Sequence, residues 1–187
     1  DIFVVPDEWD SWSKTHEHAQ EWSKLKNQLL PNTNLMVVLQ GEDFNEIKRL
    51  YKFCYELGYR YFALNHSSVA YDKAFPHKNT LVSKMMGRIQ LVDFMCDRFH
   101  KDDVYVHLLG ATLPQEFMYY KGYNFLKSVD TSNPILVGAS GESYGKLGML
   151  DKPKDKMEKF FDKDVMKHIN IISENVRTFR ELIKLSK

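Results

Sequence analysis

The 187-residue chain has few cysteines, almost no net charge and no long apolar run. Its two cysteines, Cys54 and Cys96, lie far apart within apolar helical patterns, so neither a disulfide framework nor a cysteine zinc site is indicated. No apolar run approaches the roughly 20 residues of a membrane span, and the first residues lack the basic start of a signal peptide. We therefore expect a cytoplasmic protein without a membrane partner.

The net charge of +1 gives no general basic surface, although proteins that bind phosphate backbones usually carry one. Any such surface must be local. One basic cluster lies near a predicted strand-end loop and contains Lys73, His77, Lys78, Lys84 and Arg88. This cluster is either a phosphate-binding surface or an ordinary solvated face, and the sequence leaves both interpretations open.

Short apolar runs alternate with longer helical patterns along the chain. The predicted strands are 2–5, 35–39, 61–64, 104–109 and 125–129, and the clearest helices are 12–30, 44–57 and 81–99. Repeated strand–helix units are typical of an α/β fold with a parallel sheet, either doubly wound or closed as a barrel. We expect one domain over 1–187, with a core to residue 150 and a helical segment over 151–187.

Each predicted strand stops at a residue suited to chemistry or recognition, namely Asp7, Gln40, Asn65, Gly110 and Asp130. In a (β/α) barrel of the TIM type, all C-terminal strand ends open onto one face, where catalytic groups gather. These residues therefore favour the barrel. The first strand has nothing before it to pair with, so we expect a barrel that is incomplete or shortened at its N-terminus.

Several strand-end motifs occur in an order and spacing that resemble the guanine pocket of tRNA-guanine transglycosylases. They are Val4-Val5-Pro6-Asp7, Val38-Leu39-Gln40-Gly41, the strand from Tyr59 to Asn65, His107-Leu108-Leu109-Gly110 and Ser128-Val129-Asp130-Thr131-Ser132-Asn133-Pro134. The resemblance extends to about Gly141. It is closest to the short phage and bacterial relatives that place 7-deazaguanines of the preQ0 type in DNA, because the zinc-binding cysteines of the tRNA enzymes have no counterpart here.

The resemblance implies a base exchange in nucleic acid, with DNA favoured over tRNA as the polymer and a free 7-deazaguanine as the incoming base. Asp130 lies where the family's aspartate nucleophile attacks the sugar and releases guanine. The family also uses a second aspartate as general acid/base, and no residue of this chain matches it. No cofactor and no metal are implied.

The residue types fit this chemistry. Base displacement passes through an oxocarbenium-like sugar, which a carboxylate such as Asp130 can stabilise and then trap. Guanine presents hydrogen-bond donors and an acceptor. The carboxylate of Asp7 and the amide of Gln40 together offer the complementary acceptors and donors, so they could bind the base. Gly110 permits a close approach of backbone to a flat base, and Gly41 lets the chain turn away. Asn65 and His66 are further pocket candidates.

Other interpretations stay open at this stage. Water could resolve the intermediate, which would make the protein a hydrolytic DNA base glycosylase. Alternatively, the missing second aspartate would suit a non-catalytic subunit that binds a base or nucleic acid. A homo-oligomer and a complex with a partner subunit both stay open. An aspartate that closes a strand is also often a helix N-cap, which is the structural alternative for Asp7 and Asp130.

Overall fold

The computed structural model describes residues 1–111, 113–144 and 164–185. They form two compact units, the first made of Asp1–Leu109 and Asn124–Val129 and the second of Gly110–Tyr123 and Asp130–Lys187. The expected boundary at residue 150 lies outside the described residues.

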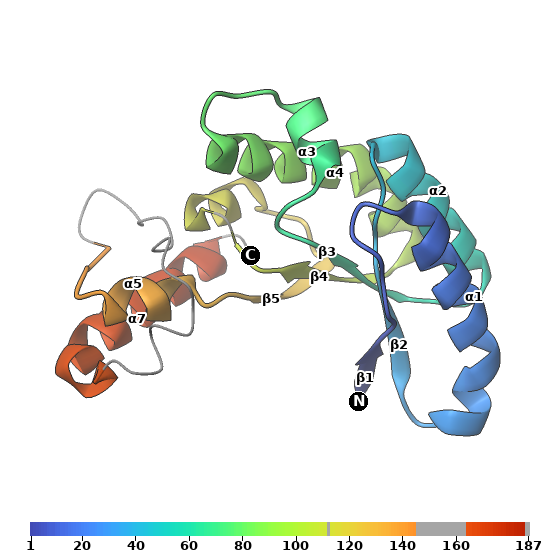
Figure 1. The fold of residues 1–187 in the computed structure, drawn as a ribbon, viewed down its shortest axis with the longest axis horizontal. Helices are drawn as coiled ribbons and strands as arrows, with labels where there is room; N and C mark the ends of the chain where they lie inside the picture. The colour runs from blue at the N-terminus through green and yellow to red at the C-terminus, as the bar shows by residue number, and fades with distance from the viewer. Residues whose placement is uncertain (112, 145–163, 186–187) are drawn as a thin grey trace. The chain divides into compact units, whose positions relative to one another are not determined.

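The first unit is built on a parallel sheet of five strands in the order β1-β2-β3-β4-β5 (Figure 1). The strands are β1 (Ile2–Val4), β2 (Asn34–Val38), β3 (Tyr61–Leu64), β4 (Tyr105–Leu109) and β5 (Leu126–Asp130). Ile2 pairs with Asn34, Met36 with Tyr61, and Tyr61 with Tyr105. The predicted α/β class with a parallel sheet is therefore confirmed.

The helices of the first unit are α1 (Trp12–Leu29), α2 (Phe44–Glu56), α3 (Val69–Ala74) and α4 (Thr80–Asp102). Each begins after a residue whose side chain accepts a hydrogen bond from the first turn, which satisfies a backbone N–H that the helix itself cannot. These N-caps are Ser11, Asp43, Ser68 and Asn79. After α2, Gly58 takes the left-handed conformation, with φ +95°, that commonly ends a helix.

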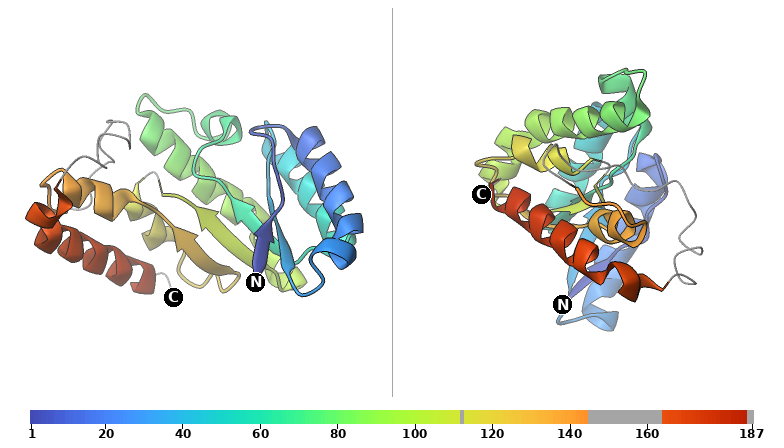
Figure 2. Two further views of the ribbon diagram at one scale, coloured as in Figure 1. Left: turned by 60° about the horizontal axis from the view of Figure 1, so that its bottom comes forward. Right: turned by 90° about the vertical axis from the view of Figure 1, so that its left-hand side faces the viewer.

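The strand order never reverses within this sheet. Because parallel crossovers are almost always right-handed, an order that runs in one direction places the connecting helices on one face. Figures 1 and 2 show α1 and α2 side by side next to β1 and β2, with α4 running along β3 and β4. Aromatic contacts join this helical layer to the sheet, with ring centroids 4.5 Å apart for Phe3 and Trp22 and 4.7 Å apart for Tyr51 and Phe62.

The opposite face of the sheet carries its own apolar cluster of Met36, Val38 and Ala63, with Tyr61, Tyr105 and Leu109 packed against it. Since successive side chains of a strand point to opposite faces, both faces of the central strands are apolar. This explains why the sequence shows near-continuous apolar runs rather than alternation. Polar residues are therefore concentrated where the strands end.

In the second unit, α5 (Asn133–Ala139) packs on α7 (Ile169–Leu185), accompanied by the 3-10 helices η1 (Pro114–Tyr119) and η2 (Val165–His168). A Cβ atom on Gly138 would lie 2.7 Å from the Cα of Ile172, so the glycine allows the two helices their close approach. Asn175 is fully buried and accepts a hydrogen bond from the backbone N–H of Tyr144 at 2.9 Å.

No helix in the described part of the chain is long and apolar enough to cross a membrane.

Candidate functional site

Three predicted site residues lie together at the C-terminal ends of β1, β2 and β3. The Gln40 Nε2 donates to Asp7 Oδ2 at 2.6 Å, and the Asn65 Nδ2 donates to Gln40 Oε1 at 3.0 Å. We call Asp7, Gln40 and Asn65 the strand-end cluster. Its members come together because adjacent parallel strands end at the same edge of the sheet.

The backbone of Asp10 fixes the direction of every hydrogen bond in the strand-end cluster. Its N–H can only donate, and it does so to Gln40 Oε1 at 3.1 Å. The Gln40 Nε2 must then face Asp7, whose carboxylate accepts. Because Asn65 gives its amide N–H to the same Gln40 oxygen, its own Oδ1 is left buried without a hydrogen-bond partner in the described structure.

Burial separates the roles of the three residues. Gln40 is 2% exposed and Asn65 6%, whereas Asp7 is exposed. Gln40 therefore positions its two neighbours rather than presenting a free edge to a ligand. What the cluster offers is a carboxylate open to solvent and a buried amide oxygen. Both are acceptors, so the cluster suits a ligand that presents hydrogen-bond donors.

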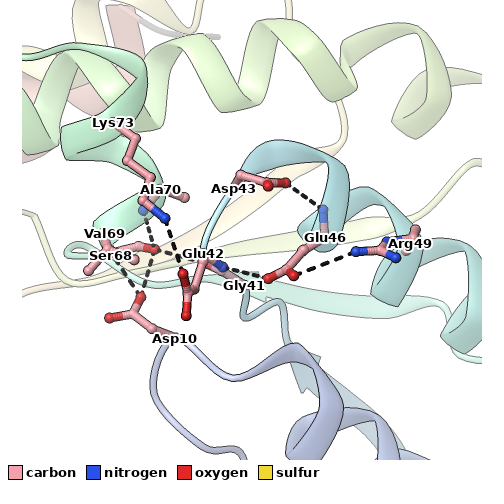
Figure 3. Close-up of polar contacts among 10 residues, drawn as sticks. All are labelled: Asp10, Gly41, Glu42, Asp43, Glu46, Arg49, Ser68, Val69, Ala70 and Lys73. Atoms are coloured by element: carbon pink, nitrogen blue, oxygen red, sulfur yellow. Dashed lines mark hydrogen bonds and ion pairs between the residues drawn. The ribbon is translucent and has the colours of Figure 1, made fainter.

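The loops that follow β1, β2 and β3 are tied to one another (Figure 3). Asp10 Oδ1 accepts from Ser68 Oγ at 2.9 Å and from the Val69 N–H at 3.2 Å. Lys73 of α3 pairs with Glu42, which follows β2, at 3.2 Å. Asp10 holds the left-handed backbone conformation with φ +55°, which is uncommon outside glycine and which aspartate adopts more readily than most other residues. These ties preorganise the edge of the sheet around the strand-end cluster.

Gly41 and His66 lie next to the strand-end cluster. A Cβ atom on Gly41 would lie 2.9 Å from Glu46 Cβ and 3.0 Å from the Ile47 nitrogen, so the glycine makes room for the first turn of α2. This packing role differs from the turn that the sequence predicts. His66 is half-buried, and its ring meets that of Trp9 edge-on, with centroids 6.5 Å apart.

Asp130 and Gly110 contact each other within the second unit. Asp130 Oδ1 accepts from the Gly110 N–H at 2.9 Å, and Gly110 adopts the left-handed conformation with φ +67°. Asp130 closes β5 and is exposed. The N-cap of α5 is Ser132 and not Asp130. In the same way, the N-cap of α1 is Ser11 and not Asp7. Neither Asp7 nor Asp130 is therefore a helix N-cap.

The predicted basic cluster is partly neutralised. Lys73 pairs with Glu42, and Lys84 pairs with Asp72 at 3.1 Å. Arg88 is 1% exposed and donates to the carbonyl oxygens of Asn65 and Leu109, each at 3.1 Å. The expectation that Arg88 lies on a phosphate-binding surface is wrong, because its guanidinium joins the ends of β3 and β4 inside the protein. Lys78 is exposed, as is His77.

Sequence reasoning missed three residues beside the strand-end cluster, namely Trp9, Asp10 and Ser68. The signal for Asp10 is weak: aspartate tolerates the left-handed conformation, but its contact with Ser68 joins residues 58 positions apart. Ser68 could have been recognised as an N-cap before α3.

No three histidine, cysteine, aspartate or glutamate side chains of the described residues stand close enough together to hold a metal ion. Compared with models of known protein families, the chain matches none, and no curated protein matches it either.

Proposed function

We propose that the protein is a guanine transglycosylase of nucleic acid, which exchanges guanine for a 7-deazaguanine base through an intermediate on Asp130. The observation that carries the proposal is the pair of acceptors in the strand-end cluster, Asp7 and the buried Oδ1 of Asn65. Guanine presents two adjacent donors, N1–H and the 2-amino group. Adenine and hypoxanthine lack this donor pair, so two fixed acceptors select guanine and its 7-deaza relatives.

The strand order supports the fold that the proposal includes. A doubly wound sheet reverses its strand order at a switch point, whereas a TIM-type barrel adds each parallel strand beside the previous one. The five strands of the first unit follow the second rule. Asp7, Gln40 and Asn65 stand at C-terminal strand ends, where barrel enzymes place their active sites.

The proposed chemistry uses Asp130 as nucleophile. A carboxylate oxygen forms a bond to the anomeric carbon while the bond from that carbon to guanine N9 breaks. The electron pair of the broken bond goes to the departing base, which takes up a proton. The incoming base then attacks the same carbon, loses its proton and releases the carboxylate. The Gly110 N–H bound to Oδ1 orients the carboxylate. DNA is favoured as the polymer because the chain lacks a cysteine cluster for zinc.

The first prediction concerns Asp130→Asn. Asparagine keeps the size but removes the charge that stabilises the oxocarbenium-like transition state, so we expect turnover to fall by orders of magnitude while binding of free guanine survives. Turnover is measured as uptake of labelled guanine into DNA or tRNA. In the wild type, denaturation during turnover should leave polymer attached to a peptide that contains Asp130. An adduct elsewhere, or undiminished uptake by the variant, would contradict the assignment.

The second prediction concerns Asp7→Asn, which is the matched change at the other aspartate. It weakens the acceptor that faces the donors of guanine, so guanine affinity should fall by about 1–3 kcal/mol and discrimination against hypoxanthine should relax. Equilibrium dialysis with labelled bases measures both quantities. Unchanged affinity for both bases would remove Asp7 from the base site. Base binding by the wild type without label uptake would favour a non-catalytic binding protein, and release of guanine without uptake would favour a hydrolase.

A further inference from the structure

An exposed tryptophan lies in the loop that joins the strand-end cluster to α1. Trp9 is 59% exposed. Its chain neighbours are fixed on both sides. The Glu8 N–H donates to Oγ1 of the buried Thr15 at 3.1 Å, and Asp10 is held by Gln40 and Ser68. Hydrogen bonds therefore hold the backbone on both sides of Trp9, while most of the indole stays exposed.

The indole stands beside the strand-end cluster. Trp9 follows Asp7 by two positions, and its ring meets the ring of His66, the residue after Asn65, at 83° between planes. An edge-on contact of this kind leaves indole surface uncovered, in agreement with the exposure of the side chain. Aromatic side chains beside a few convergent polar groups are typical of sites that bind small molecules.

We propose that Trp9 is a stacking wall for a flat heterocycle whose donor edge meets Asp7 and Asn65. The assignment rests on the proposed function, because it takes guanine as that heterocycle. It adds Trp9 as a residue that selects for planar ligands. The two acceptors alone would also accept an aliphatic amidine. An indole face favours an aromatic ring, because stacking buries both surfaces and every nucleic-acid base has a π-face. The indole face and the two acceptors together define the ligand class, which is a planar aromatic ring with hydrogen-bond donors along one edge.

Fluorescence titration with free guanine tests the assignment, because a base stacked on Trp9 quenches the indole. The chain has three tryptophans, so Trp9→Phe should abolish the quench that the wild type shows while keeping guanine affinity within about threefold. Trp9→Leu keeps apolar bulk but removes the flat face, and guanine should bind roughly 5- to 150-fold more weakly. Both variants should keep the wild-type Tm, since the side chain is mostly exposed.

Trp12→Phe is the matched control, because Trp12 contacts His16 and Arg49 on the helices. Its quench and guanine affinity should equal those of the wild type. Full affinity in Trp9→Leu, or a quench that persists in Trp9→Phe, overturns the inference and leaves the proposed function standing if Asp7→Asn still weakens binding. Failure to bind guanine, combined with Trp9-dependent binding of 2,4-diaminopyrimidine, overturns the proposed function and supports the inference. Absence of binding by both heterocycles overturns both.

Discussion

A single buried amide organises the candidate site. Gln40 accepts two hydrogen bonds on Oε1 and donates one to Asp7, so its side chain links the ends of β1, β2 and β3. An amide has one end that accepts and one that donates, which is what this position between two N–H donors and a carboxylate requires. No apolar side chain and no carboxylate could replace it.

The third prediction follows from this arrangement. Gln40→Met keeps the length of the side chain but leaves the N–H of Asp10 and the amide of Asn65 without their acceptor. Each buried unsatisfied group costs about 1–3 kcal/mol, so for two groups we expect the free energy of unfolding to fall by about 2–6 kcal/mol. Urea denaturation measures the change. Asp7→Asn is the control and should stay within about 0.5 kcal/mol of the wild type, because Asp7 is exposed. Equal stability of Gln40→Met and wild type would show that the amide network is dispensable.

The strand-end cluster could be predicted in part from the sequence. Asp7, Gln40 and Asn65 follow apolar strands, and parallel strands bring their ends to one edge, so their meeting needs no knowledge of side-chain packing. The role of each residue could not be predicted in this way. Gln40 turned out to position its neighbours, and Arg88 lies inside the protein, because both facts depend on which carbonyl or amide groups happen to lie within reach.

At the scale of elements, the strands and the long helices were predictable, and the short helix α3 was not. The five observed strands match the predicted ranges to within a residue at nearly every end, and α1, α2 and α4 were expected. The six-residue helix α3 was not, because so short a segment has no periodicity to recognise and is unstable alone. It is stabilised by its Ser68 cap and by packing on α4, where Gly87 leaves space for Tyr71.

The fourth prediction tests this packing. A Cβ atom on Gly87 would lie 2.4 Å from Tyr71 Cβ and 2.5 Å from the Tyr71 carbonyl oxygen, so Gly87→Ala must push α3 away from α4. We expect a loss of about 1–3 kcal/mol in stability and faster amide hydrogen exchange in α3. Gly58→Ala is the control. It meets no atom within 4 Å but has φ +95°, so it should cost about 1 kcal/mol without affecting exchange in α3. Slow exchange in α3 of Gly87→Ala would argue against the close contact.

At the scale of the molecule, the sequence predicts which strands and helices form but not how the chain divides. Residues Gly110–Tyr123 belong to the second unit and interrupt the first. The last strand of the first unit follows this interruption, whereas the rest of its core precedes it. The amino-acid composition of the chain does not change where this interruption begins or ends. What unites Phe125 with the first unit is its contact with Phe99, at 5.1 Å between ring centroids, which only the folded chain creates.

Buried ionisable side chains in the core of the first unit make the protein less stable at alkaline pH. Burial raises the pKa of Cys54 from its ordinary value of 9.0 to about 12, and burial also raises the pKa of Tyr51, reinforced by its hydrogen bond to Asp102. Between those two values for Cys54, the unfolded chain carries a thiolate while the folded chain keeps the thiol. The folded state then binds more protons, so its stability is complete below pH 9 and decreases as the pH rises toward 12.

The fifth prediction is that the free energy of unfolding falls by about 1.4 kcal/mol between pH 8 and pH 10 through Cys54 alone, since the unfolded thiol ionises over that range. Urea denaturation at the two values measures the change, and the ionisation of Tyr51 in the unfolded chain adds to it near pH 10. Cys54→Ala is the matched variant. It removes a buried sulfur and so lowers stability at pH 8, but its further decrease at pH 10 should be smaller than that of the wild type by the same amount. If the two proteins lose equal stability between pH 8 and pH 10, Cys54 does not remain protonated in the folded core, and the complete burial of this residue of α2 would have to be reconsidered.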